Sequence, residues 1–315
     1  MRAFLVILIF YGAFSLWAQV HSFLAVDFQN DFLDVGWHGS DRYYTAGNYL
    51  TYNNIDVGRR RVFSFSLIQQ AFTPSNLQDS LPLHFDYPYA GLLFTEGGYR
   101  WTVLNNSWSF VATVGFGQTG KYSGVAGLQR TLHRVFKDEM PRGWDYILEL
   151  GVFYQSSIGV DKLILRQKNK MLLLTQQWDW GTLSKKVQVG FCGSTGRVPL
   201  FSLHRIFVGE VQWPSPTSNL FKKCSFYLAP RLEWVVSNII LEKGLSFDRT
   251  SLSTSFSEPL IRNTILNVEA GISYPVGAWS FLFRQHWRTA ESYKSQSHHY
   301  GAITAIYQFS HKRRQ

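Results

Sequence analysis

The sequence predicts an all-β fold, a single antiparallel transmembrane β-barrel of about twelve strands with a short helix in the segment after the fifth strand. Three observations predict it. Stretches of period-two alternation recur along the 315 residues. The mean hydropathy is only -0.10, although 45% of the residues are hydrophobic. Aromatic residues reach 17%, which suits rings placed at two membrane interfaces.

The first 22 residues are predicted to be a signal peptide. Met1-Arg2 supplies a positive start, residues 3–17 form an apolar run, and the small residues Ala18 and Ser22 offer two cleavage sites. The run is too short to cross a bilayer core of about 30 Å as a helix. No later run approaches the roughly 18 apolar residues of a membrane helix. We therefore expect an exported chain whose barrel domain covers residues 23–315.

The strand predictions come from residues that alternate between an apolar and a polar or small face. In residues 108–116, for example, Trp108, Phe110 and Val114 share one face, and Ser109 and Thr113 share the other. The segment 158–184 gives no clear pattern. The predicted strands cover residues 23–33, 42–54, 61–73, 90–104, 108–117, 144–156, 185–197, 203–213, 224–240, 263–274, 279–291 and 298–309.

A formal net charge of +10 points to an anionic partner. Nucleic acid is disfavoured, because no single element interleaves a Lys/Arg stripe with stacking aromatic residues. For an exported chain, anionic lipopolysaccharide in the outer leaflet is the better candidate.

One segment breaks the strand pattern. In residues 125–136, Leu128, Leu132 and Val135 recur at helical spacing, and Gln129 and His133 are four residues apart on one helical face. A barrel does not need this helix in order to close. We therefore expect it to be a loop element or a lid over the wet interior, and a place to look for chemistry.

Several motifs occur in an order that is similar to the outer-membrane lipid A 3'-O-deacylases. They are Asn30-Asp31, residues 41–47 (DRYYTAG), Thr73-Pro74, residues 86–91 (DYPYAG), Gln129-x-x-x-His133 and Gly143-Trp144. The resemblance covers roughly the first half of the mature chain. It implies a twelve-stranded barrel in the bacterial outer membrane, acting as a monomer on lipid A in the outer leaflet. The implied reaction is calcium-dependent ester hydrolysis, which removes the 3'-linked acyloxyacyl chain.

Ester hydrolysis needs a base and a group that stabilises the oxyanion. His133 is the natural base, since a histidine is mostly neutral near pH 7. Gln129 would hold the attacking water or the substrate carbonyl. Glu139 matches an acidic position of the family, and its carboxylate would orient the imidazole of His133.

Asp31 is the expected ligand for Ca²⁺, which prefers hard oxygen donors. The Asn30 amide would join it, but adjacent strand residues point to opposite faces, so a strand end or bulge is required. Thr45 is assigned to the inward face with Tyr49, where its hydroxyl would bind substrate or support the metal. The chain has Tyr87 where the family usually has arginine, and it lacks a lysine that the family carries near residues 78–79. Lys121 would then be a replacement ligand for a lipid A phosphate.

Two other readings of the sequence stay open. The motifs could serve only to close a non-enzymatic barrel, such as a small channel or a structural envelope protein. The alternating segments could also form a soluble periplasmic β-sandwich, because alternation alone does not say which face meets lipid.

Overall fold

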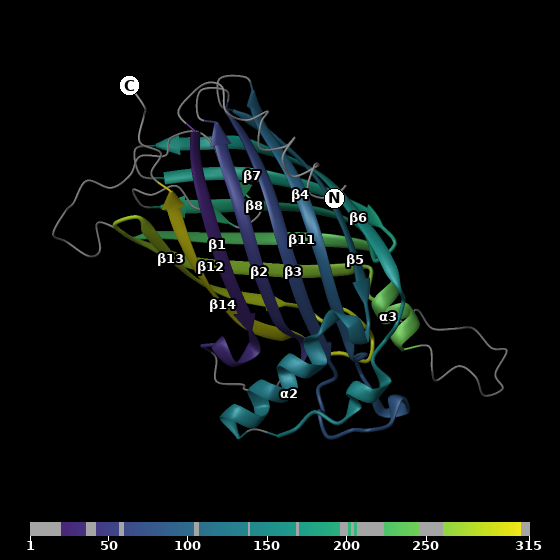
Figure 1. Cartoon of the computed structure of the whole chain (residues 1–315). Helices are drawn as coiled ribbons and strands as arrows, with labels where there is room; N and C mark the ends of the chain where they lie inside the picture. Colours follow the sequence, from purple (N-terminus) through teal and green to yellow (C-terminus); the bar gives the residue numbers. More distant parts are fainter. Residues whose placement is uncertain are drawn as a thin grey trace, which may run out of the picture.

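The computed structural model describes residues 20–35, 42–56, 60–103, 107–137, 139–167, 170–195, 201–202, 205–206, 224–245 and 261–309. Within these residues the antiparallel strands close into one barrel, in the order β1-β14-β13-β12-β11-β8-β7-β6-β5-β4-β3-β2 (Figure 1). The barrel strands are β1 (Val20–Asn30), β2 (Tyr43–Asp56), β3 (Arg61–Thr73), β4 (Ala90–Val103), β5 (Trp108–Thr119), β6 (Val152–Gln167), β7 (Lys170–Gly181), β8 (Ser184–Thr195), β11 (Ser225–Asn238), β12 (Thr264–Val276), β13 (Trp279–Arg288) and β14 (His298–Phe309).

The two faces of each strand have different chemistry. In β11, the side chains of Leu228, Leu232 and Trp234 are exposed by 52%, 53% and 60% on the outer surface. The alternate residues Tyr227 and Glu233 are buried inside. A closed sheet with an apolar outer face and a polar lumen is the arrangement of a membrane barrel. The prediction of an all-β antiparallel barrel of about twelve strands is confirmed.

The two ends of the barrel carry different connections. β1 begins where β14 ends, with Ser22 opposite Phe309. The opposite end carries η1 (Asp31–Leu33), α2 (Val125–Phe136) and α3 (Ile239–Gly244) (Figure 1). Barrels of bacterial outer membranes have their long loops at the extracellular side. The helix-bearing end therefore corresponds to the outer surface. Among the described residues, no helix has both the length and the apolar character needed to cross a membrane.

The start of β1 overlaps the segment predicted as a signal peptide. β1 begins at Val20, which pairs with Asp56 of β2. Cleavage after Ala18 would leave this strand whole, whereas cleavage after Ser22 would remove its first residues. Residues 1–19 lie outside the described part of the chain.

About twelve strands were predicted and twelve form the barrel, but two predicted strands differ from the structure. The predicted strand 144–156 overlaps β6 only at residues 152–156, because its first residues form η4 (Gly143–Tyr146). The unclear segment 158–184 contains most of β6 and all of β7. The predicted strand 203–213 is not a barrel strand, because β8 pairs directly with β11. In that region β9 (Phe201–Ser202) and β10 (Arg205–Ile206) form a separate small sheet, and residues 207–213 lie outside the described part. Charged residues such as Lys162 and Lys170 hide the alternation of β6 and β7, because long basic side chains can lie on apolar surface with their charges in water.

The helix after β5 forms over the predicted residues 125–136. Gly124, with φ +74°, precedes it, in a left-handed conformation that glycine adopts without steric cost. Lys137 ends it with φ +57°, and its N–H donates to the carbonyls of His133 and Arg134. Before and after α2 lie the short helices η3 (Lys121–Ser123) and η4 (Gly143–Tyr146).

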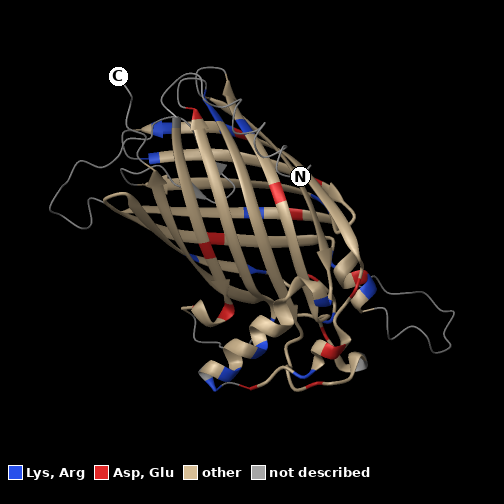
Figure 2. Cartoon of the chain, viewed as in Figure 1, with Lys and Arg blue, Asp and Glu red and all other residues tan. Residues whose placement is uncertain are grey.

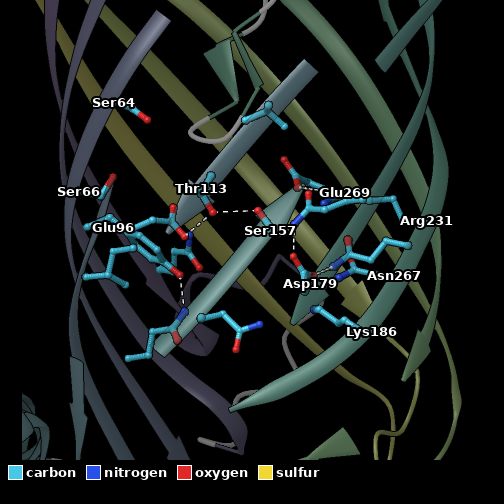
Figure 3. Close-up of a pocket in the computed structure, with 18 of the residues that line it drawn as sticks. Ser64, Ser66, Glu96, Thr113, Ser157, Asp179, Lys186, Arg231, Asn267 and Glu269 are labelled. Atoms are coloured by element: carbon cyan, nitrogen blue, oxygen red, sulfur yellow. Dashed lines mark hydrogen bonds and ion pairs between the residues drawn. The ribbon is translucent and has the colours of Figure 1, made fainter. Parts of the chain in front are cut away.

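Charged residues inside the barrel are arranged in bonded groups, and Figure 2 shows acidic and basic residues set into the barrel wall. Glu233 of β11 accepts hydrogen bonds from Arg288 of β13 and from Lys186 of β8. Two adjoining cavities of about 330 and 340 Å³ occupy the lumen. In Figure 3 the Thr113 hydroxyl on the wall of the first cavity lies between Glu96 and Ser157. The lumen is therefore polar and partly open.

Candidate active site

The Asn30-Asp31 pair lies where β1 ends. The Asn30 Oδ1 accepts a hydrogen bond from the Phe32 N–H at 2.9 Å, which caps η1 and turns the chain out of the strand. The Asp31 Oδ2 accepts one from the Arg42 N–H at 3.0 Å. Both side chains are buried. The strand end that the sequence argument required is therefore present, and the two residues are not bound to opposite faces of a regular strand.

Thr45 lies in a β-bulge of β2. The register between β2 and β3 shifts between Tyr44 and Ala46, so an extra residue is inserted there. Tyr44 enters the lumen, where its hydroxyl donates to the Gln29 Oε1 at 2.7 Å. The bulge therefore changes which of the next side chains face outward.

Thr45 faces the outside of the barrel. In β3, Phe72 lines a lumen cavity, so the alternate residues Ala71 and Thr73 face outward. The Thr45 hydroxyl lies 2.5 Å from that of Thr73. The prediction that Thr45 shares the inward face of Tyr49 is wrong, because the bulge inverts the alternation between the two residues.

α2 packs against the same outer wall. Val125, in its first turn, forms a buried cluster with Ala71 of β3 and with Trp144 of η4. Below it lies Gly91 of β4, where any Cβ atom would overlap the side chains of Ser123 and Val125. Of the two expected roles, a loop element or a lid over the wet interior, the lid is therefore wrong, and α2 is a loop element. The apolar first turn of α2 finds its packing partners on the outer wall.

The buried face of α2 carries His133 and Gln129, each only 6% exposed. The Gln129 Oε1 accepts a hydrogen bond from the Trp144 Nε1 at 2.6 Å. The His133 Nδ1 lies 2.6 Å from the backbone carbonyl oxygen of Glu139. A carbonyl oxygen can only accept, so Nδ1 carries a proton, and in the neutral imidazole Nε2 then carries the lone pair. The backbone thus holds the imidazole in the tautomer that a general base needs.

Glu139 lies in the segment that follows α2. Its side chain is exposed, and its Oε2 accepts a hydrogen bond from the Gln78 Nε2 at 3.2 Å. The carboxylate of Glu139 was expected to orient the imidazole of His133. In the structure, the backbone carbonyl of the same residue bonds to His133.

The strand register places the motif residues in one row on the outer wall. Asn30 pairs with Ala46, Ala46 with Ala71, and Ala71 with Gly91. At about 4.8 Å per strand this row is roughly 14 Å wide. α2 starts above Gly91 and has 12 residues, so it is about 18 Å long. Figure 1 shows it at the end of the barrel where η1 also lies.

Comparison with known proteins identifies the family. The model of the family described as outer membrane protein LpxR matches residues 3–309, nearly the whole chain. The chain belongs to the LpxR family. Among curated proteins, none matches this sequence.

Solved structures agree with the fold. LpxR from Salmonella typhimurium superposes with a TM-score of 0.70 at 18% identity, over 90% of this chain and 99% of the other. An outer membrane channel of the COG4313 group from Pseudomonas putida F1 gives a TM-score of 0.51 at 10% identity, over 95% and 98%. At these identities the similarity concerns the fold alone.

In this LpxR-family chain, two contact residues were missed by sequence reasoning. Trp144 was noted only as part of a motif, yet its indole N–H holds the Gln129 amide. Thr73 was noted as the end of a strand, yet its hydroxyl bonds Thr45. Both residues stood in motifs that the resemblance picked out. Their place in these motifs, as a polar or aromatic residue beside a turn, was the available signal.

Tyr87, at the position where the family usually has arginine, lines the lumen cavity near the helix-bearing end of the barrel. Its buried hydroxyl donates to the Glu291 Oε2 at 2.9 Å. Burial and the neighbouring carboxylate raise the pKa of Tyr87 well above its usual value, so the hydroxyl stays protonated. Burial alone would raise the pKa of Glu291, but the Arg288 guanidinium outweighs it and lowers that pKa. Tyr87 therefore makes a structural hydrogen bond inside the barrel, whereas α2 lies on the outer side of the wall.

Proposed function

We propose that this protein is an outer-membrane esterase that removes the 3'-linked acyloxyacyl chain from lipid A. The LpxR family match and the ordered motifs support the substrate class. The observation that carries the proposal is the imidazole of His133, held in its Nδ1–H tautomer on a helix that packs on the lipid-facing wall. An ester in the outer leaflet can approach this wall without leaving the membrane.

The proposed reaction is attack of water on the ester carbonyl. The His133 Nε2 takes the proton from water as the oxygen bonds to the carbonyl carbon. The Gln129 amide, anchored through its oxygen by Trp144, presents N–H donors suited to the developing oxyanion. Collapse of the tetrahedral intermediate breaks the ester bond, and His133 returns the proton to the leaving hydroxyl. Burial of both side chains limits competing water.

Calcium is part of the proposal, through Asp31. The polar side chains at this end of the outer wall, Asp31, Asn30, Thr45 and Thr73, offer oxygen donors, the type that Ca²⁺ prefers. Among the described residues there is no group of three His, Cys, Asp or Glu side chains that could hold a metal. Asp31 is the charged ligand that we propose, and backbone carbonyls, water and substrate would complete the shell. A bound cation would polarise the ester carbonyl.

Mass spectrometry of lipid A from a heterologous host that expresses the protein tests this proposal. We expect a new lipid A species that lacks one acyloxyacyl chain. In purified outer membranes supplied with intact lipid A, a chelator should suppress formation of this species. Removal of the metal should slow release at least about tenfold, because it removes one source of oxyanion stabilisation. A correctly folded barrel that leaves lipid A unchanged with added Ca²⁺ would instead favour the non-enzymatic alternative.

Gly91→Val tests whether activity depends on the packing of α2 against the barrel wall. The added side chain overlaps Ser123 and Val125, so α2 must shift on the wall while the barrel strands stay paired. We expect acyl release to fall on the order of 10²-fold, because catalysis is sensitive to misplacement by about 1 Å. Heat-modifiable migration on a gel should be unchanged. Gly97→Val is the matched control, since a Cβ atom there meets nothing within 4 Å. Equal activity of both variants would contradict the proposed role of α2.

A further inference from the structure

α2 has two exposed edges, one on each side of its buried face, and the proposed reaction uses neither of them. Leu128 and Val135 lie two turns apart on one edge and are 39% and 66% exposed. Arg134, one position beyond His133, is exposed on the opposite edge, and Lys137 is exposed at the helix end. The buried face with Gln129 and His133 lies between these edges.

The two cations at the end of α2 differ from other basic residues nearby. Arg130 pairs with Asp145 at 3.0 Å, and Lys121 lies 3.9 Å from Glu149. Within the part of the chain that the structure describes, neither Arg134 nor Lys137 makes an ion pair. Figure 2 shows basic and no acidic residues on α2 itself. Lys121 therefore has an acidic partner within 4 Å, whereas Arg134 and Lys137 have none among the described residues.

The position of α2 determines what can cover these edges. The helix packs on the outer wall through Val125 and Ala71, at the end of the barrel that corresponds to the outer surface. A helix with an apolar edge and a basic edge at a membrane surface lies between acyl chains and headgroups. The partner must then have acyl chains and anionic groups in one molecule.

We propose that the outer edges of α2 bind phosphorylated lipid of the outer leaflet, with a phosphate at Arg134 and Lys137 and an acyl chain along Leu128 and Val135. The occupant is lipid A, and this inference rests on the proposed function for its placement beside His133. A phosphate bound at the helix end and a chain bound along the apolar edge hold the lipid on both sides of the imidazole. These residues position the substrate and take no part in proton transfer.

The charge arm of the test uses the double variant Arg134→Gln/Lys137→Gly. Glycine suits the left-handed backbone at position 137, where φ is +57°, so the substitution removes a charge without straining the helix end. Binding of bisphosphorylated and dephosphorylated lipid A is measured by native mass spectrometry in a His133→Ala background, which prevents turnover. We expect the parent to prefer the phosphorylated lipid by about tenfold or more per cation, and the double variant to lose this preference.

The controls separate this inference from the proposed function. Arg61→Gln/Lys170→Gln removes two exposed charges at the opposite end of the barrel and should keep the preference. Leu128→Ser/Val135→Ser should weaken binding of both lipids equally. A double variant at positions 134 and 137 that retains the preference, or a parent without one, overturns the inference. A preserved preference in a protein that releases no acyl chain would overturn the esterase alone.

Discussion

Replacing His133 by alanine should lower acyl release by about 10²- to 10⁴-fold, the range that a general base contributes. The lone pair on Nε2 exists because the Glu139 carbonyl holds the proton on Nδ1. Alanine removes the base and is the best helix former, so α2 should keep its structure. The measurement is the rate of acyl release from lipid A in mixed micelles with Ca²⁺ present.

His84→Ala is the control for this variant, because His84 is an exposed histidine in η2 (Pro82–His84), at the same end of the barrel. It should retain the parent rate. Both proteins should show the same heat-modifiable migration, which reports an intact barrel. A His133→Ala protein within about tenfold of the parent rate would identify a different base. The esterase proposal would then need another nucleophile or base near the outer wall.

Sequence alternation was enough to predict the barrel, because each strand must place unlike residues toward lipid and lumen. It failed where polar residues occupy both faces of a strand. In β7, the inward Thr175 and Asp179 alternate with Gln176 and two tryptophans, Trp178 and Trp180. The outward row is therefore interrupted by an amide. Pairing of the flanking strands β6 and β8 decides the assignment, and pairing is not visible in a single sequence.

The residues of the candidate site stay a prediction, whereas the side of the barrel wall on which Thr45 lies was predicted wrongly. Motif spacing identified Asn30, Asp31, Thr45, Gln129 and His133 as a set, and the structure gathers their elements at one end of the barrel. The side of the wall on which Thr45 lies depends on one inserted residue in β2. A bulge has no strong sequence signature, because it needs only one residue that leaves the regular pairing.

The imidazole contact shows a second limit. A carboxylate was expected beside His133, because a sequence specifies side chains but not the path of the backbone. The backbone carbonyl of Glu139 reaches Nδ1 because the chain turns back after Lys137, which ends α2 in a left-handed conformation. A backbone contact of this kind depends on the path of the loop and is independent of the identity of the side chain.

Glu233→Ala should destabilise the barrel by about 3 kcal/mol, the lower part of the range for breaking a buried charge pair. Glu233 is 2% exposed. It accepts bonds from Arg288 at 2.9 and 3.1 Å and from Lys186 at 3.3 Å. It therefore ties β11 to β13 and to β8. A connection of 28 residues, 196–223, which includes β9 and β10, links β8 to Cys224 before β11, so closing this seam has an entropic cost that the ion pairs offset.

The loss should appear as a lower midpoint of urea unfolding for the protein folded in detergent micelles. Glu233→Gln keeps the size and one acceptor oxygen, so it should lose less than alanine does. Leu232→Ala removes the adjacent side chain, which faces lipid and is 53% exposed, and should cost less still. The loss of stability should therefore be largest for Glu233→Ala, smaller for Glu233→Gln and smallest for Leu232→Ala, an order that follows from burial and charge together. If Glu233→Ala lay within about 1 kcal/mol of the parent, water in the lumen cavities would solvate Arg288 and Lys186 well enough to replace the carboxylate. The seam between β8 and β11 would then be held by backbone pairing alone.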